Sequence, residues 1–146
     1  MRRRINKKNA AILLLISTIL FLVIQYHYKS FDSVLGANGI NVTKVDMRNG
    51  NTGGYVSTTD KDKIKELVNL VDNRYYRKSF MHLNQMSGFT FYYDFYVGDK
   101  QILRISGDGN NVQLNNTHYH VSKSISNKLL TNWFNSLPIT QWYILT

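Results

Sequence analysis

Residues 9–28 read NAAILLLISTILFLVIQYHY and carry no formal charge over these twenty positions. A helix of this length rises about 30 Å, which matches the hydrocarbon core of a bilayer. The segment ends in two tyrosines, Tyr26 and Tyr28, and is preceded by basic residues without an acidic one: Arg2, Arg3, Arg4, Lys7 and Lys8. Because basic residues favour the cytoplasmic side and aromatic residues the interface, we predict a single transmembrane helix over residues 9–28 of a cell membrane protein. Residues 1–8 form its cytoplasmic basic tail, and the rest of the chain lies outside.

A cleaved signal peptide is the main alternative, because the strictly apolar part, residues 10–24, is short and follows a basic segment. Cleavage requires small residues soon after the apolar run, yet residues 25–29 are all large and suitable positions come only near residues 34–37. The lack of cysteine excludes lipid attachment through an N-terminal cysteine. A core helix of a globular protein is a third interpretation. The spacing favours an uncleaved anchor.

The net charge of +9 divides unevenly along the 146 residues. Residues 1–37 hold six basic and one acidic residue, or +5, and residues 38–146 hold twelve and eight, or +4. More than half of the charge is thus explained by membrane topology, and the rest does not cluster, so we expect no nucleic acid partner. With no cysteine there are no disulfides and no thiolate metal sites. The outer part has room for one domain.

We expect a short tether over residues 29–39 and an α+β domain over residues 40–146, with an antiparallel sheet, two helices and the element order ββαββββα. The predicted strands cover residues 40–48, 55–58, 89–97, 101–106, 111–114 and 118–121, and the predicted helices cover residues 60–74 and 122–137. Ser122 and Ser124 are the expected caps of the second helix. The apolar segment 139–146 is expected to pair as an edge strand or to pack on the core.

Two patterns support this assignment best. Apolar residues recur at helical spacing in the first predicted helix, at Ile64, Leu67, Val68 and Val71. Residues 89–97, FTFYYDFYV, alternate strictly, which is typical of a strand with one face on a core. Gly98-Asp99 then supplies a tight turn to the next strand.

Residues 75–88, YYRKSFMHLNQMSG, have no sustained period and leave two interpretations open. The favoured one is a connecting loop whose aromatic rings lie in the core while the basic side chains stay in water. The other is a basic, aromatic lip that contacts anionic headgroups or an acidic partner.

Few residues suggest chemistry. His118 and His120 share a strand face at metal-ligand spacing, with His82 or Asp94 as conceivable companions, but this short pattern is unspecific and we expect no metal site. Asp108-Gly109-Asn110-Asn111 lacks the spacing and closing Glu of a calcium loop and is expected to be a turn. No nucleophile elbow, phosphate loop, dinucleotide fingerprint or zinc-protease motif occurs. We therefore expect no cofactor, no catalytic residues and no enzyme.

The candidate partner-binding residues are Tyr92, Asp94 and Tyr96, on the face of the central strand opposite its aromatic row. They are exposed if the helices cover only the other face, and rigid, amphipathic Tyr side chains are common in partner surfaces. The alternative is that the second helix or the C-terminal segment covers them.

The domain resembles small uncharacterised extracytoplasmic domains of membrane-anchored or lipid-attached surface proteins of low-GC Gram-positive bacteria. The similar parts are TTDKDKIKELV at 58–68, VGDKQILRI at 97–105 and HYHVS at 118–122. The resemblance implies a bacterial extracytoplasmic α+β module, with no catalytic residues to transfer.

These observations predict a single-pass protein, anchored in the lipid bilayer through residues 9–28, whose outer domain is a non-catalytic binding or sensing module for a membrane or surface protein. The alternatives are an anchored immunity or inhibitor protein and, less favoured, an enzyme acting on the cell wall or on peptides.

Overall fold

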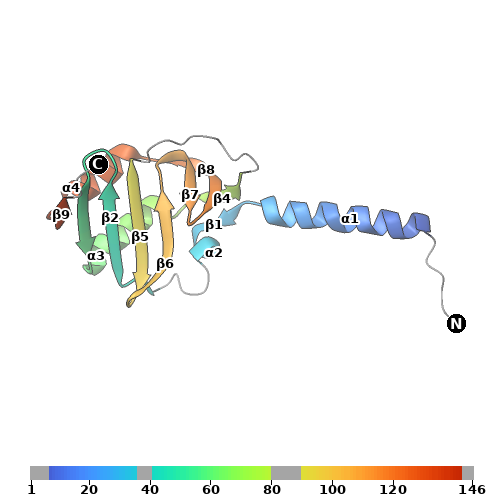
Figure 1. The fold of residues 1–146 in the computed structure, drawn as a ribbon, viewed down its shortest axis with the longest axis horizontal. Helices are drawn as coiled ribbons and strands as arrows, with labels where there is room; N and C mark the ends of the chain where they lie inside the picture. The colour runs from blue at the N-terminus through green and yellow to red at the C-terminus, as the bar shows by residue number, and fades with distance from the viewer. Residues whose placement is uncertain (1–6, 36–40, 80–89, 143–146) are drawn as a thin grey trace.

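The computed structural model describes residues 7–35, 41–79 and 90–142, and in these ranges the chain is an α+β protein with an N-terminal apolar helix and an antiparallel sheet (Figure 1). The elements are α1 (Lys7–Tyr26), β1 (Lys29–Ser30), α2 (Phe31–Leu35), β2 (Lys44–Asn49), β3 (Gly54–Thr58), α3 (Lys61–Val71), β4 (Tyr75–Lys78), β5 (Phe91–Val97), β6 (Lys100–Ser106), β7 (Gly109–Leu114), β8 (Thr117–Ile125), α4 (Asn127–Asn135) and β9 (Gln141–Trp142).

The nine described strands form one sheet in the order β1-β4-β8-β7-β6-β5-β2-β3-β9, and all neighbours are antiparallel. Strands β5 to β8 follow one another as a meander with tight turns. The β5–β6 turn contains Gly98 at a φ of 57°, a conformation that glycine adopts without steric cost. Strand β2 lies beside β5, with Val45 opposite Phe95, so the first hairpin joins the meander at its β5 edge.

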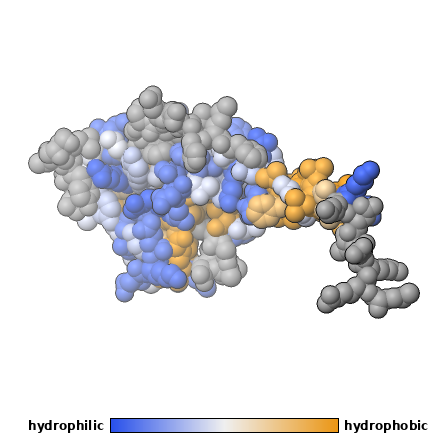
Figure 2. Space-filling view, turned by 45° about the vertical axis from the view of Figure 1, so that its right-hand side comes forward, coloured by the Kyte–Doolittle hydropathy of each residue, from blue (hydrophilic) through white to orange (hydrophobic). Residues whose placement is uncertain are grey.

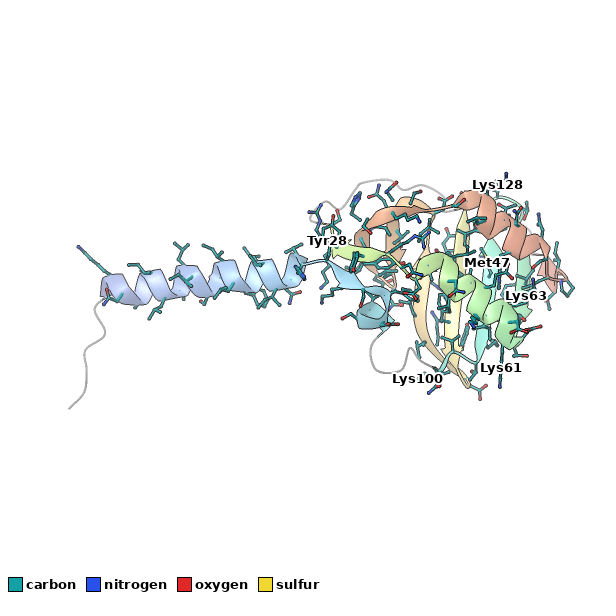
Figure 3. All side chains as sticks on the ribbon, turned by 180° about the vertical axis from the view of Figure 1, so that it is seen from behind. Tyr28, Met47, Lys61, Lys63, Lys100 and Lys128 are labelled. Carbon is teal, nitrogen blue, oxygen red and sulfur yellow. The ribbon has the colours of Figure 1, made fainter. Side chains whose placement is uncertain are left out.

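Helices α3 and α4 cover one face of the sheet, as the view from behind shows (Figure 3). The central strand β5 directs Phe91, Tyr93 and Phe95 toward this side, and all three are fully buried. The other large buried side chains include Tyr76, Phe31, Met47, Leu67, Ile105, Ile125, Leu130 and Trp133. The Trp133 indole Nε1 donates a hydrogen bond to the Lys63 carbonyl at 2.9 Å, which joins α4 to α3. One core therefore lies between the helices and the sheet.

Helices α3 and α4 each begin with a side-chain cap. The Asp60 carboxylate accepts from the backbone N–H groups of Asp62, at 2.8 Å, and Lys63, at 3.3 Å, at the start of α3. The Ser126 hydroxyl accepts from the Leu129 N–H at 3.3 Å at the start of α4. Such caps satisfy N–H groups that have no partner within the helix.

Helix α1 extends away from the domain and is apolar over most of its surface (Figures 1 and 2). Residues 8–24 are all exposed, and contact with the domain begins only at Gln25 and Tyr26, which are half-buried. The part from Lys8 to Tyr26 has a mean hydropathy of 2.1 and is long and apolar enough to cross a membrane. By these criteria alone it is compatible with either an anchor or a signal sequence.

The structure confirms the fold class and corrects the predicted order ββαββββα and the predicted number of helices. The described residues contain four helices, including α1 and the short α2. Strand β8 continues through Ile125, so the last helix begins at Asn127 with Ser126 as its cap, and the expected caps Ser122 and Ser124 lie within the strand. The predicted helix 60–74 is shorter, at Lys61–Val71, and residues 141–142 form an edge strand beside β3, as one interpretation of segment 139–146 proposed.

Two segments expected to be irregular also contribute strands. Tyr75–Lys78, the start of the predicted loop 75–88, forms β4 beside β8. Within the predicted tether, Lys29–Ser30 forms β1 beside β4, and Phe31 in α2 is fully buried. The Phe31 ring lies 5.8 Å from the Tyr76 ring and 6.1 Å from the Phe95 ring, measured between centroids. Residues 29–35 are thus part of the domain.

Candidate functional site

The sheet face turned away from α3 and α4 is polar, and no described helix lies over its central strands (Figures 1 and 3). Strict alternation along the strands produces this face. In β2, Val45 and Met47 enter the core, while Lys44, Asp46 and Arg48 point the other way. In β5, Tyr92, Asp94 and Tyr96 have the same orientation and are half-buried.

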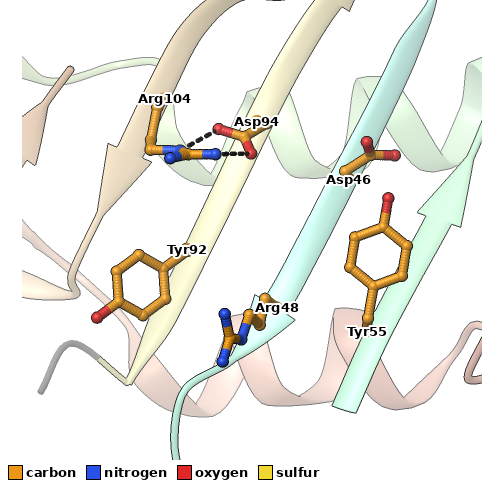
Figure 4. A pocket seen from close by; sticks show the side chains of 6 residues that line it. All are labelled: Asp46, Arg48, Tyr55, Tyr92, Asp94 and Arg104. Carbon is orange, nitrogen blue, oxygen red and sulfur yellow. Dashed lines mark hydrogen bonds and ion pairs between the residues drawn. The ribbon is translucent and has the colours of Figure 1, made fainter. Parts of the chain in front are cut away.

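A hollow of about 430 Å³ opens on this face across β3, β2, β5 and β6 (Figure 4). Two Asp, two Arg and two Tyr line it, so that the formal charges of its walls cancel: Asp46, Arg48, Tyr55, Tyr92, Asp94 and Arg104. We refer to these six residues as the polar hollow.

Asp94 and Arg104 form the first of two charged pairs. Arg104 Nε and Nη2 each donate to an Asp94 carboxylate oxygen at 2.7 Å, and Gln101 Nε2 donates to the same carboxylate at 3.0 Å. The two partners lie directly opposite each other in the β5–β6 hairpin. Hydrogen bonding to Asp94 raises the pKa of Arg104. The fork geometry of the bidentate pair fixes the orientation of the guanidinium.

Asp46 and Lys44 form the second charged pair, and Asp46 is only 6% exposed. The Ser57 hydroxyl donates to Asp46 Oδ1 at 2.7 Å, and Lys44 Nζ lies 3.0 Å from Oδ2. Burial raises the pKa of Asp46, but hydrogen bonds from Ser57, Lys44 and Tyr55 outweigh this effect, so the net shift is downward. Asp46 is therefore a stable anion at neutral pH.

Two tyrosines lie next to this second charged pair. The Tyr55 hydroxyl points toward Asp46 (Figure 4), and burial, followed by the Asp46 hydrogen bond, raises the pKa of Tyr55. Burial, followed by the negative charges of Asp46 and Asp94, raises the pKa of Tyr96 to about 12. Lys44 Nζ lies 4.4 Å from the centre of the Tyr96 ring, within cation–π range. Both phenols thus keep their protons at neutral pH.

The arrangement presents fixed charges, hydroxyl donors and aromatic surface in one shallow area. General acid–base catalysis works best with a group whose pKa lies near the working pH, whereas the shifts found here move Asp46 down and the tyrosines up. This chemistry suits recognition of a polar partner.

The structure places all three predicted partner-binding residues, Tyr92, Asp94 and Tyr96, on the polar sheet face that faces away from α3 and α4, and two of them line the polar hollow. Sequence reasoning did not identify Asp46, Arg48, Tyr55 or Arg104. The available signal was the charged residue at every second position of β2. A strand that is buried on both faces seldom carries charged side chains, so this alternation indicates that one face of β2 is polar.

The histidines are placed elsewhere. His118 and His120 are half-buried on β8, and His120 Nδ1 lies 3.3 Å from Asn111 Oδ1. Within the described ranges no three His, Asp or Glu side chains come together as a metal site, and His82 lies outside those ranges. The expected turn Asp108-Gly109-Asn110-Asn111 is wrong, because its last three residues belong to β7, and Asp108 accepts a hydrogen bond from the Asn127 side chain.

Comparisons with protein-family models, curated proteins and solved structures found no match to this chain.

Proposed function

We propose that the chain is a single-pass membrane protein, with residues 1–8 in the cytoplasm and the sheet domain on the outer side. The 19-residue stretch of α1 from Lys8 to Tyr26 has the required length and hydropathy, and its residues 8–24 are all exposed. A core helix of a soluble protein would be largely covered, and an exposed apolar helix in water is unfavourable. The basic residues before the helix support this orientation.

The outer domain serves as a non-catalytic binding or sensing module, and the polar hollow together with Tyr96 is its contact surface for a membrane or surface protein. The observation that carries this proposal is a sheet face that no described helix covers, on which tyrosines and paired charges surround a hollow. Tyr and Arg are enriched in protein interfaces because they combine apolar area with directed hydrogen bonds. Anchoring raises the effective concentration of the module near partners in the same membrane, so modest affinity suffices.

Site-specific photo-crosslinking in the native membrane tests this function. A photoreactive phenylalanine analogue replaces Tyr92 in one variant and Asn69, an exposed residue of α3 on the opposite face, in a matched control. We expect a discrete crosslinked protein from position 92 only, and its loss when Tyr96→Ala is added. Equal products from both positions, or a product from position 92 that Tyr96→Ala leaves unchanged, would contradict this role.

A further inference from the structure

The domain is joined to α1 without a spacer. Only His27 and Tyr28 separate the end of α1 from β1, so the first strand begins within about 11 Å of the last helical residue. Lys78 Nζ in β4 donates to Gln25 Oε1 at 3.3 Å, and the Arg77 guanidinium lies 5.2 Å from the centre of the Tyr28 ring. The β1–β4 edge of the sheet is thus fixed at the point where α1 would leave the hydrocarbon.

The charge of this edge has one sign. The first three strands in the sheet order, β1, β4 and β8, contain no acidic residue and four basic ones: Lys29, Arg77, Lys78 and Lys123. The central strands β2 and β5, by contrast, contain Asp46 and Asp94. Basic side chains at a membrane surface are attracted to anionic lipids over roughly a Debye length.

The same edge offers aromatic and apolar surface. Tyr75 is 58% exposed and Tyr28 is 38% exposed, and both line a second hollow, of about 350 Å³, together with His27 and Ser122. Figure 3 shows Tyr28 at the junction of α1 and the domain. Tyr side chains are enriched at headgroup depth, because the ring contacts apolar lipid while the hydroxyl stays hydrated.

We propose that this edge, formed by Tyr28, Tyr75, Arg77 and Lys78, lies in the headgroup layer of the bilayer that α1 crosses and binds anionic phospholipid there. The inference rests on the proposed membrane span of α1. This contact holds the domain on the lipid surface in one orientation. The polar hollow is in a different part of the sheet and remains available to a partner.

The test uses the full chain in vesicles of phosphatidylcholine with a fraction of phosphatidylglycerol. Because the chain has no cysteine, single cysteines carrying a nitroxide can be placed without background labelling. Label depth is measured from collisions with lipid-soluble oxygen and with a water-soluble nickel complex. Position 75 replaces Tyr75, position 16 in the middle of α1 serves as the bilayer control, and position 51 in the distal β2–β3 turn serves as the water control.

We expect the label at position 75 to report headgroup depth, between the labels at 16 and 51. Arg77→Glu should shift it toward water, whereas Lys100→Glu, the corresponding charge reversal at an exposed site of β6 distant from α1 (Figure 3), should not. A label at 75 as hydrated as the label at 51 overturns the docking, and so does equal behaviour of the two charge variants. If the label at 16 is also hydrated, the membrane span itself fails and the docking fails with it.

Discussion

Replacing Phe31 by alanine tests whether residues 29–35 belong to the folded domain. Phe31 is 0% exposed, and its ring lies between those of Tyr76 and Phe95. Removing a buried Phe side chain costs about 3–5 kcal/mol, because the transfer free energy is lost and a cavity remains. A domain of this size has a total stability of about 5–15 kcal/mol. Phe31→Ala should therefore remove a large part of the free energy of unfolding.

The assay is urea unfolding of the full chain in detergent, followed by tryptophan fluorescence, since Trp133 is 1% exposed in the core and reports on its opening. With a urea dependence of about 1–3 kcal/mol per molar for small domains, the loss lowers the unfolding midpoint by about 1 M or more. Phe21→Ala is the matched control, because Phe21 is 60% exposed on α1 and makes no part of the core. The same side-chain deletion there should leave the midpoint unchanged.

A loss below about 1 kcal/mol for Phe31→Ala, comparable to a surface substitution, would refute the reasoning. It would mean that the segment between α1 and β2 is a tether, as its sequence suggests, and that the domain folds without it. The docking of the β1–β4 edge would then lose its support as well.

Two further predictions concern the domain alone. Asp60→Ala should lower the free energy of unfolding by about 0.5–2 kcal/mol, because the cap of α3 is lost, while Lys65→Ala on the exposed face of the same helix should have little effect in the same urea assay. The pKa of Tyr96 is about 12 in the folded protein against an ordinary 10.0, so its contribution to stability is complete below pH 10 and is lost as the pH rises toward 12. Tyr96→Phe should therefore show a shallower loss of stability over this range, and an unchanged slope would contradict the shift.

The sequence predicts the central part of the fold because local patterns determine it. Strand β5 alternates strictly and Gly98 fixes its turn, so the β5–β6 hairpin depends on neighbouring residues only. Helix α3 similarly has a capping residue, Asp60, and a regular apolar stripe. These elements could be derived without knowledge of the rest of the chain.

The remaining elements depend on distant pairing. Strand β4 has a single fully buried residue, Tyr76, whose partner Val121 is far along the chain, so no local period marks it. The end of β8 is set by the pairing of Ile125 with Gly109, although two earlier serines could each have capped a helix. Without the register of the sheet, local propensity places the helix too early.

The candidate site depends on the register of the sheet as well. The β5–β6 turn sets Val97 opposite Lys100, and this register would continue to Leu103 opposite Asp94. A β-bulge between Phe95 and Tyr96 shifts the register by one residue and brings Arg104 opposite Asp94, which the turn alone does not imply. Asp46 reaches the site only because β2 pairs with β5, and this pairing joins segments that no local signal relates. Only Tyr92 and Asp94 could therefore be placed from the alternation of β5, and the other lining residues required the register and order of the sheet.

The sheet order also assigns the two proposed surfaces to different strands. In Figure 1 the strands succeed one another away from α1, with β1 and β4 nearest to it. The polar hollow lies on β3, β2, β5 and β6, whereas the proposed lipid contact lies at Tyr28 and on β4. Once α1 spans a bilayer and the β1–β4 edge rests on it, the lipid and the partner contact different strands of the domain. A variant of the hollow should therefore change partner crosslinking while leaving label depth at position 75 unchanged.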